Sequence, residues 1–577
     1  MKLNKRSIKR CGIFLFFDKD GIVDEYVIRM LEDLQENLDY LLVVCNGYVK
    51  YKDLDALRKV SDDVISRANV GFDVGGYREG LFYLGWKFLS QFDELVMLNY
   101  TCFAPIFPFK EMFDAMAEKD VSFWGPSKHH KVVPDPFGVL PYGYLPEHIQ
   151  SHFLVLRNDL FMSYQYRDFI FNMKNPKSYL DSICGYEAIF TKYFEDLGFT
   201  WDVYVETDEY EGYSYFPLMF YTTEILQNKR SPIIKRRSFF TDYSDYLLNT
   251  CGEPSSDMYD YLKESGVYDL NPVWDNLLRL ENMTAIHRVL HLNYMLDQDV
   301  TDYEGNKKIA LVLIVDSVKR CRWYARYLKK LPSQTAVHIY GSEENCKVME
   351  TMCRDFLRAE YHPAEHGTYV KYLLQASKDL AKEQYDYTGV LHMKDVELQR
   401  PYSNAVSWQY ADWENLFVNK ELIGNVIKTF EENPRMGLMI PPVPCYGSLQ
   451  ETIGMGWCGK FQQVKSCLEA NNIRLNINEK QTPLTPLGGS FWMRGDLFSR
   501  LSAAAVSEEE DVYLMALPYI VQSFYAYTGV GYSERYAAVE ITNQDYMMRE
   551  NNKVLFEKYG PNYHKVVVER IYSGTFQ

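Results

Sequence analysis

The sequence predicts an α/β protein built from two tandem domains of the same kind. The chain has 577 residues, which is too long for a single hydrophobic core. Short apolar runs of strand length alternate with amphipathic helical patterns, as in an α/β sheet. The stretch "HFLVLRNDLF" from His152 is also repeated as "SFWMRGDLF" from Ser490.

Four pairs of segments repeat in the same order. "GIFLFFDKD" and "LVLIVDS" end apolar runs on Asp18 and Asp316, and "YLLVVCNG" resembles "AVHIYGSEE". "FDELVMLNYT" resembles "YDYTGVLHMKD", and the last pair aligns Arg157 with Arg494. The spacing between partners is nearly constant for three pairs and longer for the fourth. This indicates a collinear duplication with an insertion in the second copy.

The repeat sets the expected domain boundaries. We place the first α/β domain at residues 8–225 and the second at 307–545, each with a central, mainly parallel sheet. Residues 226–306 between them read as a helical, basic connector. Residues 546–577 form a C-terminal tail.

Composition excludes some classes of protein. The net charge of −16 argues against general binding to nucleic acid, because such proteins cluster Lys and Arg against phosphates. The eleven cysteines form no C-x-x-C motif, which indicates free thiols in a reducing compartment. The apolar run "GIFLFF" is too short for the core of a signal peptide. A cytoplasmic protein is expected.

Two basic segments suggest a peripheral contact with the membrane. Residues 1–10 are basic, and "NKRSPIIKRR" contains Lys229, Arg230, Lys235, Arg236 and Arg237. Such a cluster could touch anionic lipid at about 1 kcal/mol per cation. A solvated linker is the equally plausible alternative.

Ligands of open α/β sheets bind beyond the carboxyl ends of the strands, where several candidate residues follow the predicted strands. Asp18 and Asp316 could hydrogen-bond a ribose or a base, although a turn or helix cap would explain either one. "NVGFDVGGYREGL" places Asp73 beside two glycines, followed by Tyr77 and Arg78. Gly75 and Gly76 would let the backbone approach a ligand, and Arg78 could meet a phosphate.

The third pair of repeats bears on metal binding. Transferases that use sugar nucleotides commonly hold Mg²⁺ or Mn²⁺ on the diphosphate with carboxylates at this strand end. "GVLHMKDVE" offers His392, Lys394, Asp395 and Glu397 as ligands or as a cation for the diphosphate, with Asp395 and Glu397 the metal candidates. "ELVMLNYT" offers Asn99 and Thr101 but no carboxylate, which weakens the case for a metal in the first domain.

An acidic residue follows the repeated Arg-x-Asp-Leu-Phe stretch in each copy. Glu187 stands in "CGYEAIFTKYFEDLGF", and Glu510 and Asp511 stand in "SEEEDVYLMALPY". Such a carboxylate suits a general base for an acceptor hydroxyl. An acidic helix N-terminus is the alternative.

With these motifs in view, the chain resembles the rhamnan synthesis protein F family of bacterial rhamnosyltransferases. The resemblance rests on "FDVGGYREGL", "FDELVMLNYTCFAPIFP", "FWGPS", "HIQSHFLVLRNDLF" and "YEAIFTKYFEDLGF" in the first half. In the second half it rests on "YDYTGVLHMKD", "MGLMIPPVP" and "LGGSFWMRGDLF".

The resemblance implies transfer of L-rhamnose from dTDP-L-rhamnose to a polyprenyl-diphosphate-linked rhamnose polysaccharide, at the inner face of the membrane. It also implies that both domains have the GT-A-like fold of nucleotide-diphospho-sugar transferases. Tyr100 stands where the family's strand-end motif has an acid, which again questions a metal in the first domain. Glu187 and Asp395 are the expected catalytic residues. The expected donor-binding residues are Asp18, Asp73, Gly75, Gly76, Tyr77, Arg78, Asn99, Thr101, Arg157, Asp316, His392, Lys394 and Arg494.

Three arrangements of activity stay open. The two halves could share one active site, or each could make its own linkage. Alternatively, one half is a non-catalytic carbohydrate-binding or docking module.

Overall fold

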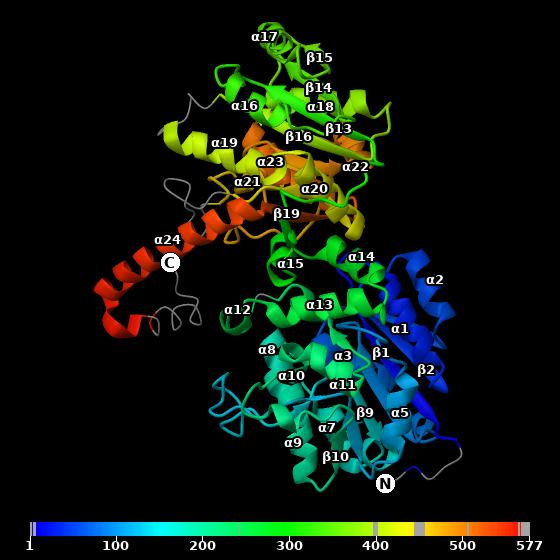
Figure 1. Cartoon of the computed structure of the whole chain (residues 1–577). Coiled ribbons are helices and arrows are strands. Elements are labelled where there is room, and N and C mark those ends of the chain that lie inside the picture. Colours follow the sequence, from blue (N-terminus) through cyan, green and yellow to red (C-terminus); the bar gives the residue numbers. More distant parts are fainter. Residues whose placement is uncertain are drawn as a thin grey trace. The chain divides into compact units, whose positions relative to one another are not determined.

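The computed structural model describes residues 3, 7–241, 243–395, 402–443, 456–504, 507–563 and 566 (Figure 1). The chain divides into two compact units. Unit 1 comprises Met1–Thr241 and Tyr246–Asn276, and unit 2 comprises Asp242–Asp245 and Leu277–Gln577. The segment 226–306, expected as a connector, is therefore shared between the two units.

Unit 1 is built on a sheet of seven strands in the order β10-β6-β9-β4-β1-β2-β3. Strands β3, β2, β1 and β4 are parallel, whereas β9 runs antiparallel to both β4 and β6. β1 and β4 are buried along their whole length, as expected for strands covered on both faces. The bounds are β1 Arg10–Phe16, β2 Tyr40–Asn46, β3 Asp63–Arg67, β4 Glu94–Asn99, β6 Phe123–Gly125, β9 Phe153–Arg157 and β10 Trp201–Val203.

Helices cover this sheet, and two short ribbons lie beside it. β5 (Cys102–Phe103) pairs with β11 (Ile234–Lys235), and β7 (Lys128–His129) pairs with β8 (His148–Ile149). The helices are α1 Glu25–Gln35, α2 Tyr51–Lys59, α3 Phe72–Leu84, α4 Trp86–Leu89, α5 Phe109–Ala117, α6 Asn158–Phe161, α7 Tyr164–Asn172, α8 Tyr179–Ser182, the π-helix η1 Ile183–Glu187, α9 Ala188–Asp196, α10 Pro217–Phe220, α11 Thr222–Lys229 and α13 Glu253–Ser265.

Unit 2 is built on a sheet of eight strands in the order β12-β19-β17-β18-β16-β13-β14-β15. Its strands are β12 Asn293–Leu296, β13 Ile309–Val315, β14 Ala336–Gly341, β15 Ala359–Pro363, β16 Tyr387–Met393, β17 Met436–Ile440, β18 Phe491–Arg494 and β19 Tyr527–Ser533. Its helices are α15 Met283–Val289, α16 Cys321–Leu328, α17 Glu343–Cys353, α18 Tyr369–Leu380, α19 Tyr402–Leu416, α20 Lys420–Glu432, α21 Phe461–Ala470, α22 Gly495–Arg500, α23 Glu510–Gln522 and α24 Glu534–Tyr559. α12 (Ser244–Thr250) and α14 (Asn271–Leu280) cross the boundary between the units.

The two sheets have the same topology. Starting at the edge strand β3 in unit 1 and β15 in unit 2, each sheet has four parallel strands followed by one antiparallel strand, which is β9 in unit 1 and β18 in unit 2. Unit 2 has one additional strand, β12, at the far edge. Arg157 on β9 pairs with Glu94, and Arg494 on β18 pairs with Tyr387, the first residue of the corresponding strand in each case. The predicted fold class, two tandem α/β domains, and the equivalence of the two arginines are confirmed.

The register corrects one pair of the repeat. Leu15 lies opposite Asn99, and Ile314 lies opposite His392, so Leu15 corresponds to Ile314. Asp316 consequently takes the place of Phe17, one residue before the place of Asp18. Because neighbouring residues of a strand point to opposite faces, the two aspartates are not equivalent.

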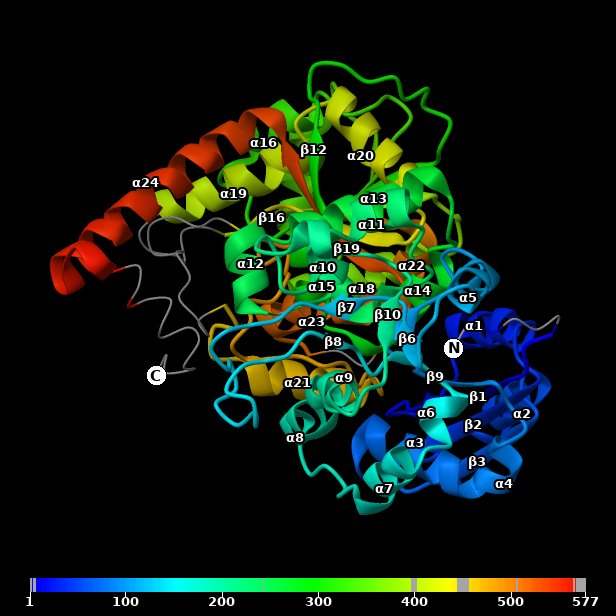
Figure 2. The same cartoon turned by 90° about the horizontal axis from the view of Figure 1, so that it is seen from below.

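The glycines of "FDVGGYREGL" serve helix packing. They lie within α3, which packs on β1 and β2 (Figure 2). A Cβ at Gly76 would come within 2.2 Å of Leu15 Cδ1, and one at Gly80 would come within 2.8 Å of Ile13. A Cβ at Gly75 would meet the Val70 carbonyl at 2.7 Å. The expectation that Gly75 and Gly76 open the backbone to a ligand is therefore corrected: they let α3 approach the sheet and its own preceding loop.

The basic run 228–237 is taken up by contacts inside unit 1. Lys229 pairs with Glu209 at 3.1 Å, and Arg230 pairs with Glu111 at 2.6 Å. Lys235 contacts His152, and the Arg236 side chain donates to Asn276 at 2.6 Å. Lys229 and Arg230 are therefore compensated by carboxylates, which leaves fewer cations of this run for anionic lipid. Among the described residues, no helix is both long enough and apolar enough to span a bilayer.

Candidate functional site

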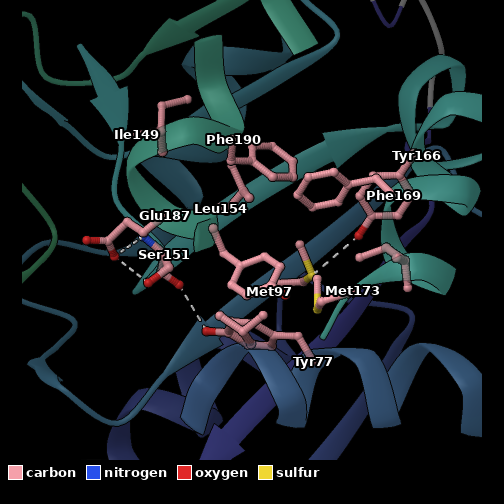
Figure 3. Close-up of a pocket in the computed structure, with 13 residues that line it drawn as sticks. Tyr77, Met97, Ile149, Ser151, Leu154, Tyr166, Phe169, Met173, Glu187 and Phe190 are labelled. Carbon is pink, nitrogen blue, oxygen red and sulfur yellow. Dashed lines mark hydrogen bonds between the residues drawn. The ribbon is translucent and has the colours of Figure 1, made fainter. Parts of the chain in front are cut away.

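Two carboxylates in unit 1 meet at one serine. The Ser151 amide donates to Glu187 Oε2 at 2.8 Å, and its hydroxyl lies within hydrogen-bond distance of Glu187 and, at 2.9 Å, of Asp73 Oδ2. The Ser182 hydroxyl donates to the other oxygen of Asp73 at 3.0 Å. Figure 3 shows Ser151 between Glu187 and the ring of Tyr77, whose hydroxyl donates to the Ser151 carbonyl at 3.0 Å. Three segments far apart in sequence thus converge.

The local backbone places each carboxylate. Gly71 ends the loop before α3 at φ 80°, a left-handed conformation that favours glycine, and puts Asp73 in the first turn of the helix. Glu187 closes the π-helical turn η1, just before α9. Such π-turns inside helices are frequent at functional sites. Ser151 lies between β8 and β9, beside the carboxyl end of β4.

The number of protons available for hydrogen bonding gives Asp73 and Glu187 different roles. Ser151 has one hydroxyl proton and two carboxylate neighbours, so it can donate to only one of them. Burial and the neighbouring charge of Glu187 raise the pKa of Asp73 above its ordinary value. A protonated Asp73 would donate to Ser151, which would then donate to Glu187. In this arrangement Glu187 accepts from both the amide and the hydroxyl of Ser151.

An apolar cavity of about 60 Å³ opens beside this pair (Figure 3). Ser151 and Glu187 form its polar side. The rest of the wall comes from α3, β4, β8, β9, α7 and η1–α9: Val74, Tyr77, Met97, Ile149, Leu154, Tyr166, Phe169, Ile170, Met173, Tyr186 and Phe190. It can accept a small apolar group next to a base.

The strand ends of unit 1 hold polar side chains without a carboxylate pair. Asn99 Oδ1 accepts from the amide and the hydroxyl of Thr101, at 3.1 and 2.7 Å. Asp18 Oδ1 accepts from the amides of Asp20 and Ile22, so it stabilises the turn after β1. Tyr100 packs its ring against Phe16 and Phe17. These residues do not fit a divalent cation at the end of β4.

Arg78 does not face the strand ends as a phosphate ligand. Its guanidinium donates to the Met173 carbonyl and to the Asn175 side chain. It therefore fixes the loop after α7, next to the cavity wall. The expectation that Arg78 meets a phosphate is corrected to a role in holding this loop.

Lys235 is the cation that sequence reasoning missed. β11 brings it opposite Cys102, just beyond the end of β4, and the next residue donates its amide to the Thr101 carbonyl at 3.0 Å. Lys235 Nζ lies 2.7 Å from Nδ1 of buried His152, and no carboxylate of the described residues forms an ion pair with it. Burial, followed by the charge of Lys235, holds the pKa of His152 well below its usual range, so the ring is neutral. A half-buried cation without a counter-charge suits an anionic ligand.

Unit 2 carries a second cluster at the equivalent edge. His392 Nε2 lies 2.7 Å from Asp316 Oδ2, and Lys394 Nζ lies 2.7 Å from Glu510 Oε1. Glu510 begins α23, between the equivalents of β9 and β10, where Glu187 stands in unit 1. Burial alone would raise the pKa of Asp316, but His392 and Lys394 hold it below its ordinary value. The predicted residues Asp316, His392 and Lys394 are thus brought together.

The two predicted metal candidates gain no further support. Asp395 directly follows Lys394, and Glu397 lies outside the described residues. Asp316, His392 and Glu510 are close enough to share an ion, but the ammonium of Lys394 already compensates Glu510. A divalent cation there would have to displace that charge.

Arg157 and Arg494 lie at the opposite edge of their sheets. Arg157 donates to the carbonyls of Met116, Lys119 and Val121, at 2.6, 2.8 and 3.0 Å. Arg494 donates in the same way to Phe430, Asn433 and Met436. Each arginine ties the end of a helix, α5 or α20, to the amino end of the strands. The expectation that they bind a donor is corrected to a structural role.

Comparisons with solved structures return glycosyltransferases and nucleotidyltransferases among their matches. A glycosyltransferase, GlyE of Streptococcus pneumoniae, is 12% identical and matches 70% of this chain and 98% of its own, with a TM-score of 0.22. A putative glucose-1-phosphate thymidylyltransferase of Bacillus anthracis is 8% identical and matches 34% and 86%, with a TM-score of 0.24.

Among curated proteins, the uncharacterized protein y4gN of Sinorhizobium fredii is 24% identical over 193 residues. This match spans 33% of the present chain and slightly less than half, 46%, of that protein. The family model for rhamnan synthesis protein F matches residues 41–513. This range includes both clusters and the strands of both sheets except β1, the first residue of β2, and β19. The chain belongs to the rhamnan synthesis protein F family.

Proposed function

We propose that the protein is a rhamnosyltransferase that uses dTDP-L-rhamnose and extends a polyprenyl-diphosphate-linked rhamnose polysaccharide, with Glu187 as its general base. The meeting of Asp73, Ser151 and Glu187 at the ligand edge of unit 1 carries this proposal. Membership in the rhamnan synthesis protein F family supports the substrate class. The GT-A-like character of both units is part of the same proposal.

The proposed reaction follows from the hydrogen bonds among Asp73, Ser151 and Glu187. Glu187 takes the proton of an acceptor hydroxyl as its oxygen attacks the anomeric carbon of the donor sugar. The bond from that carbon to the diphosphate breaks, and dTDP leaves with inversion at the anomeric carbon. Asp73, which is linked to Glu187 through Ser151, holds the carboxylate of Glu187 in place. General-base assistance of this kind is worth about 10²–10⁴-fold in rate.

The apolar cavity supports a deoxy sugar. Rhamnose carries a methyl group where most hexoses carry a hydroxymethyl group. The cavity beside Glu187 is lined almost wholly by apolar side chains. A methyl group gains from burial there, whereas a hydroxyl would lose its hydrogen bonds to water.

We assign the diphosphate of the donor in unit 1 to Lys235 rather than to a metal. The end of β4 offers Asn99 and Thr101 without an acid, and Lys235 stands just beyond it with no acidic partner among the described residues. An ammonium can stabilise the departing diphosphate electrostatically. This makes the first unit metal-independent.

The substitution Glu187→Gln tests the proposal. We expect transfer to fall by about 10²–10⁴-fold, while the dissociation constant for dTDP-L-rhamnose stays near that of the wild type. Glu79→Gln, which makes the same change at an exposed position of α3, is the matched control and should be fully active. Near wild-type turnover of Glu187→Gln would move the active site out of unit 1.

A second candidate function is a bifunctional enzyme that makes two linkages. The observation in its favour is the duplicated placement of Glu510, in contact with Lys394 and near His392. Glu510→Gln or Asp395→Asn would then abolish one linkage and leave the other. If both variants make the wild-type product, unit 2 is a binding module.

The cellular location of the protein follows from its acceptor. A lipid-linked acceptor requires the enzyme to act at the inner face of the cell membrane. The paired state of Lys229 and Arg230 favours a contact through the acceptor over one through a basic patch. Flotation with anionic vesicles in the presence and absence of acceptor separates the two.

A further inference from the structure

A cluster in unit 2, away from both candidate sites, has the composition of a transition-metal site. His338 lies on β14, and Glu360 and His362 lie on β15, the outermost strand of the sheet (Figure 1). His338 pairs in register with Glu360, and Tyr340 pairs with His362. Because alternate residues of a strand share a face, all four side chains lie on the same face.

The distances agree with coordination of one ion. His338 Nδ1 lies 3.3 Å from His362 Nε2 and 3.6 Å from Glu360 Oε2. Two ligands of a tetrahedral zinc ion with bonds of about 2.0–2.1 Å lie about 3.3–3.4 Å apart. Two of the three distances between the ligand atoms are therefore close to what a tetrahedral ion requires, and all three atoms lie within 4.8 Å of one another.

Neighbouring side chains orient the two imidazoles. His338 Nε2 lies 3.3 Å from the Tyr385 hydroxyl, which in turn donates to Glu383 at 2.5 Å. A proton on Nε2 leaves the lone pair of Nδ1 facing His362 and Glu360, and such outer partners are typical of histidine ligands. The ring of His362 stacks on Tyr340, with centroids 4.4 Å apart and planes 9° apart.

We propose that His338, Glu360 and His362 bind one divalent transition-metal ion, of which Zn²⁺ is the representative, and that the ion clamps β15 to β14. Two imidazoles and one carboxylate suit zinc, whereas Mg²⁺ and Ca²⁺ prefer oxygen ligands alone. Three protein ligands leave a fourth position for water. The ion would secure the outermost strand, which has only one neighbour in the sheet.

Titration of the full-length protein with Zn²⁺ in excess Mg²⁺, followed by calorimetry, tests the site. We expect one tight Zn²⁺ per chain. His362→Ala should weaken it at least tenfold, and Glu360→Gln should weaken it less. His366→Ala removes an exposed imidazole four residues further along and should bind as the wild type does.

Two further readouts keep the test independent of folding and of transfer activity. Co²⁺ in place of Zn²⁺ should give the intense visible absorption of a tetrahedral ion in wild type and not in His362→Ala. Zn²⁺ should also slow amide exchange in Ala359–Pro363 of the wild type and of His366→Ala, but not of His362→Ala. Equal Zn²⁺ affinity of His362→Ala and His366→Ala would overturn the proposal. The absence of a stoichiometric site in wild type would also overturn it, and would leave only a hydrogen bond between the two imidazoles.

Discussion

A substitution at Arg157 tests whether this residue stabilises the fold rather than binds the donor. The substitution Arg157→Met keeps most of the side-chain volume and removes the guanidinium. Arg157 is 1% exposed and donates to three carbonyls at the end of α5. Its Nε also lies 3.4 Å from Glu94, which keeps Arg10 at 2.7 Å and Trp124 at 3.0 Å as partners.

The structure sets the size of the effect. Hydrogen bonds from a charged donor contribute about 1.5–3 kcal/mol each, and buried acceptors left without a partner cost about 1–3 kcal/mol. The three carbonyls and the partial loss of compensation at Glu94, which retains two partners, together lead us to expect a loss of about 3–5 kcal/mol in the free energy of unfolding of unit 1. Arg494→Met removes the same kind of contact in unit 2 without a neighbouring buried carboxylate, so we expect a smaller loss of about 2–3 kcal/mol.

Hydrogen exchange measured peptide by peptide separates the two units. Arg157→Met should speed exchange in α5 by roughly a hundredfold to a few thousandfold, at tenfold per 1.4 kcal/mol, and leave α20 unchanged. Arg494→Met should do the reverse. Both variants should bind dTDP-L-rhamnose with wild-type affinity under conditions where they are folded. Loss of donor binding by Arg157→Met with unchanged exchange in α5 would refute the structural role.

Three further predictions concern packing, pH and the donor. Gly76→Ala places a Cβ 2.2 Å from Leu15 and should lower the melting temperature, because it destabilises the fold by about 1–3 kcal/mol. Gly185→Ala has open space around its Cβ and should leave the melting temperature unchanged, so equal melting temperatures of the two variants would contradict the packing role. Burial raises the pKa of Asp412 to about 8, so the folded state holds a proton that the unfolded state loses near pH 4. The free energy of unfolding of the wild type, measured in urea, should therefore fall between pH 4 and pH 8 by up to about 5 kcal/mol relative to that of Asp412→Asn. Parallel pH curves for the two proteins would exclude this protonation. Lys235→Gln should raise the dissociation constant for dTDP more than Lys229→Gln does, and addition of Mg²⁺ should not restore it; equal affinities would exclude Lys235 from the donor site.

The sequence predicted the architecture because the repeated segments are the buried strands themselves. Buried strands need nearly continuous apolar residues, so "ELVMLN" and "YTGVLHM" remain recognisable after divergence. The place of Glu187 could be predicted because an acid follows the repeated Arg-x-Asp-Leu-Phe stretch in each copy, before a helical stretch.

The sequence repeat gave wrong predictions where residues needed for packing and residues needed for binding recur in the same way. Arg157 and Arg494 are repeated because each sheet needs its helix tied down, and Gly76 is required by Leu15 rather than by a ligand. Ser151 and Lys235 could not be predicted. A serine carries little information by itself, and Lys235 reaches the strand end only through the pairing of β11 with β5.

The central claim is that this chain transfers rhamnose from dTDP-L-rhamnose. Its most direct test offers the purified protein dTDP-L-rhamnose beside other sugar nucleotides, with a rhamnosylated polyprenyl-diphosphate acceptor, and follows the acceptor by mass spectrometry. The account predicts that dTDP-L-rhamnose alone lengthens the acceptor by deoxyhexose units, and that chelation of divalent cations does not stop transfer at the first unit. Lengthening by a different sugar nucleotide, with dTDP-L-rhamnose left intact, would contradict it.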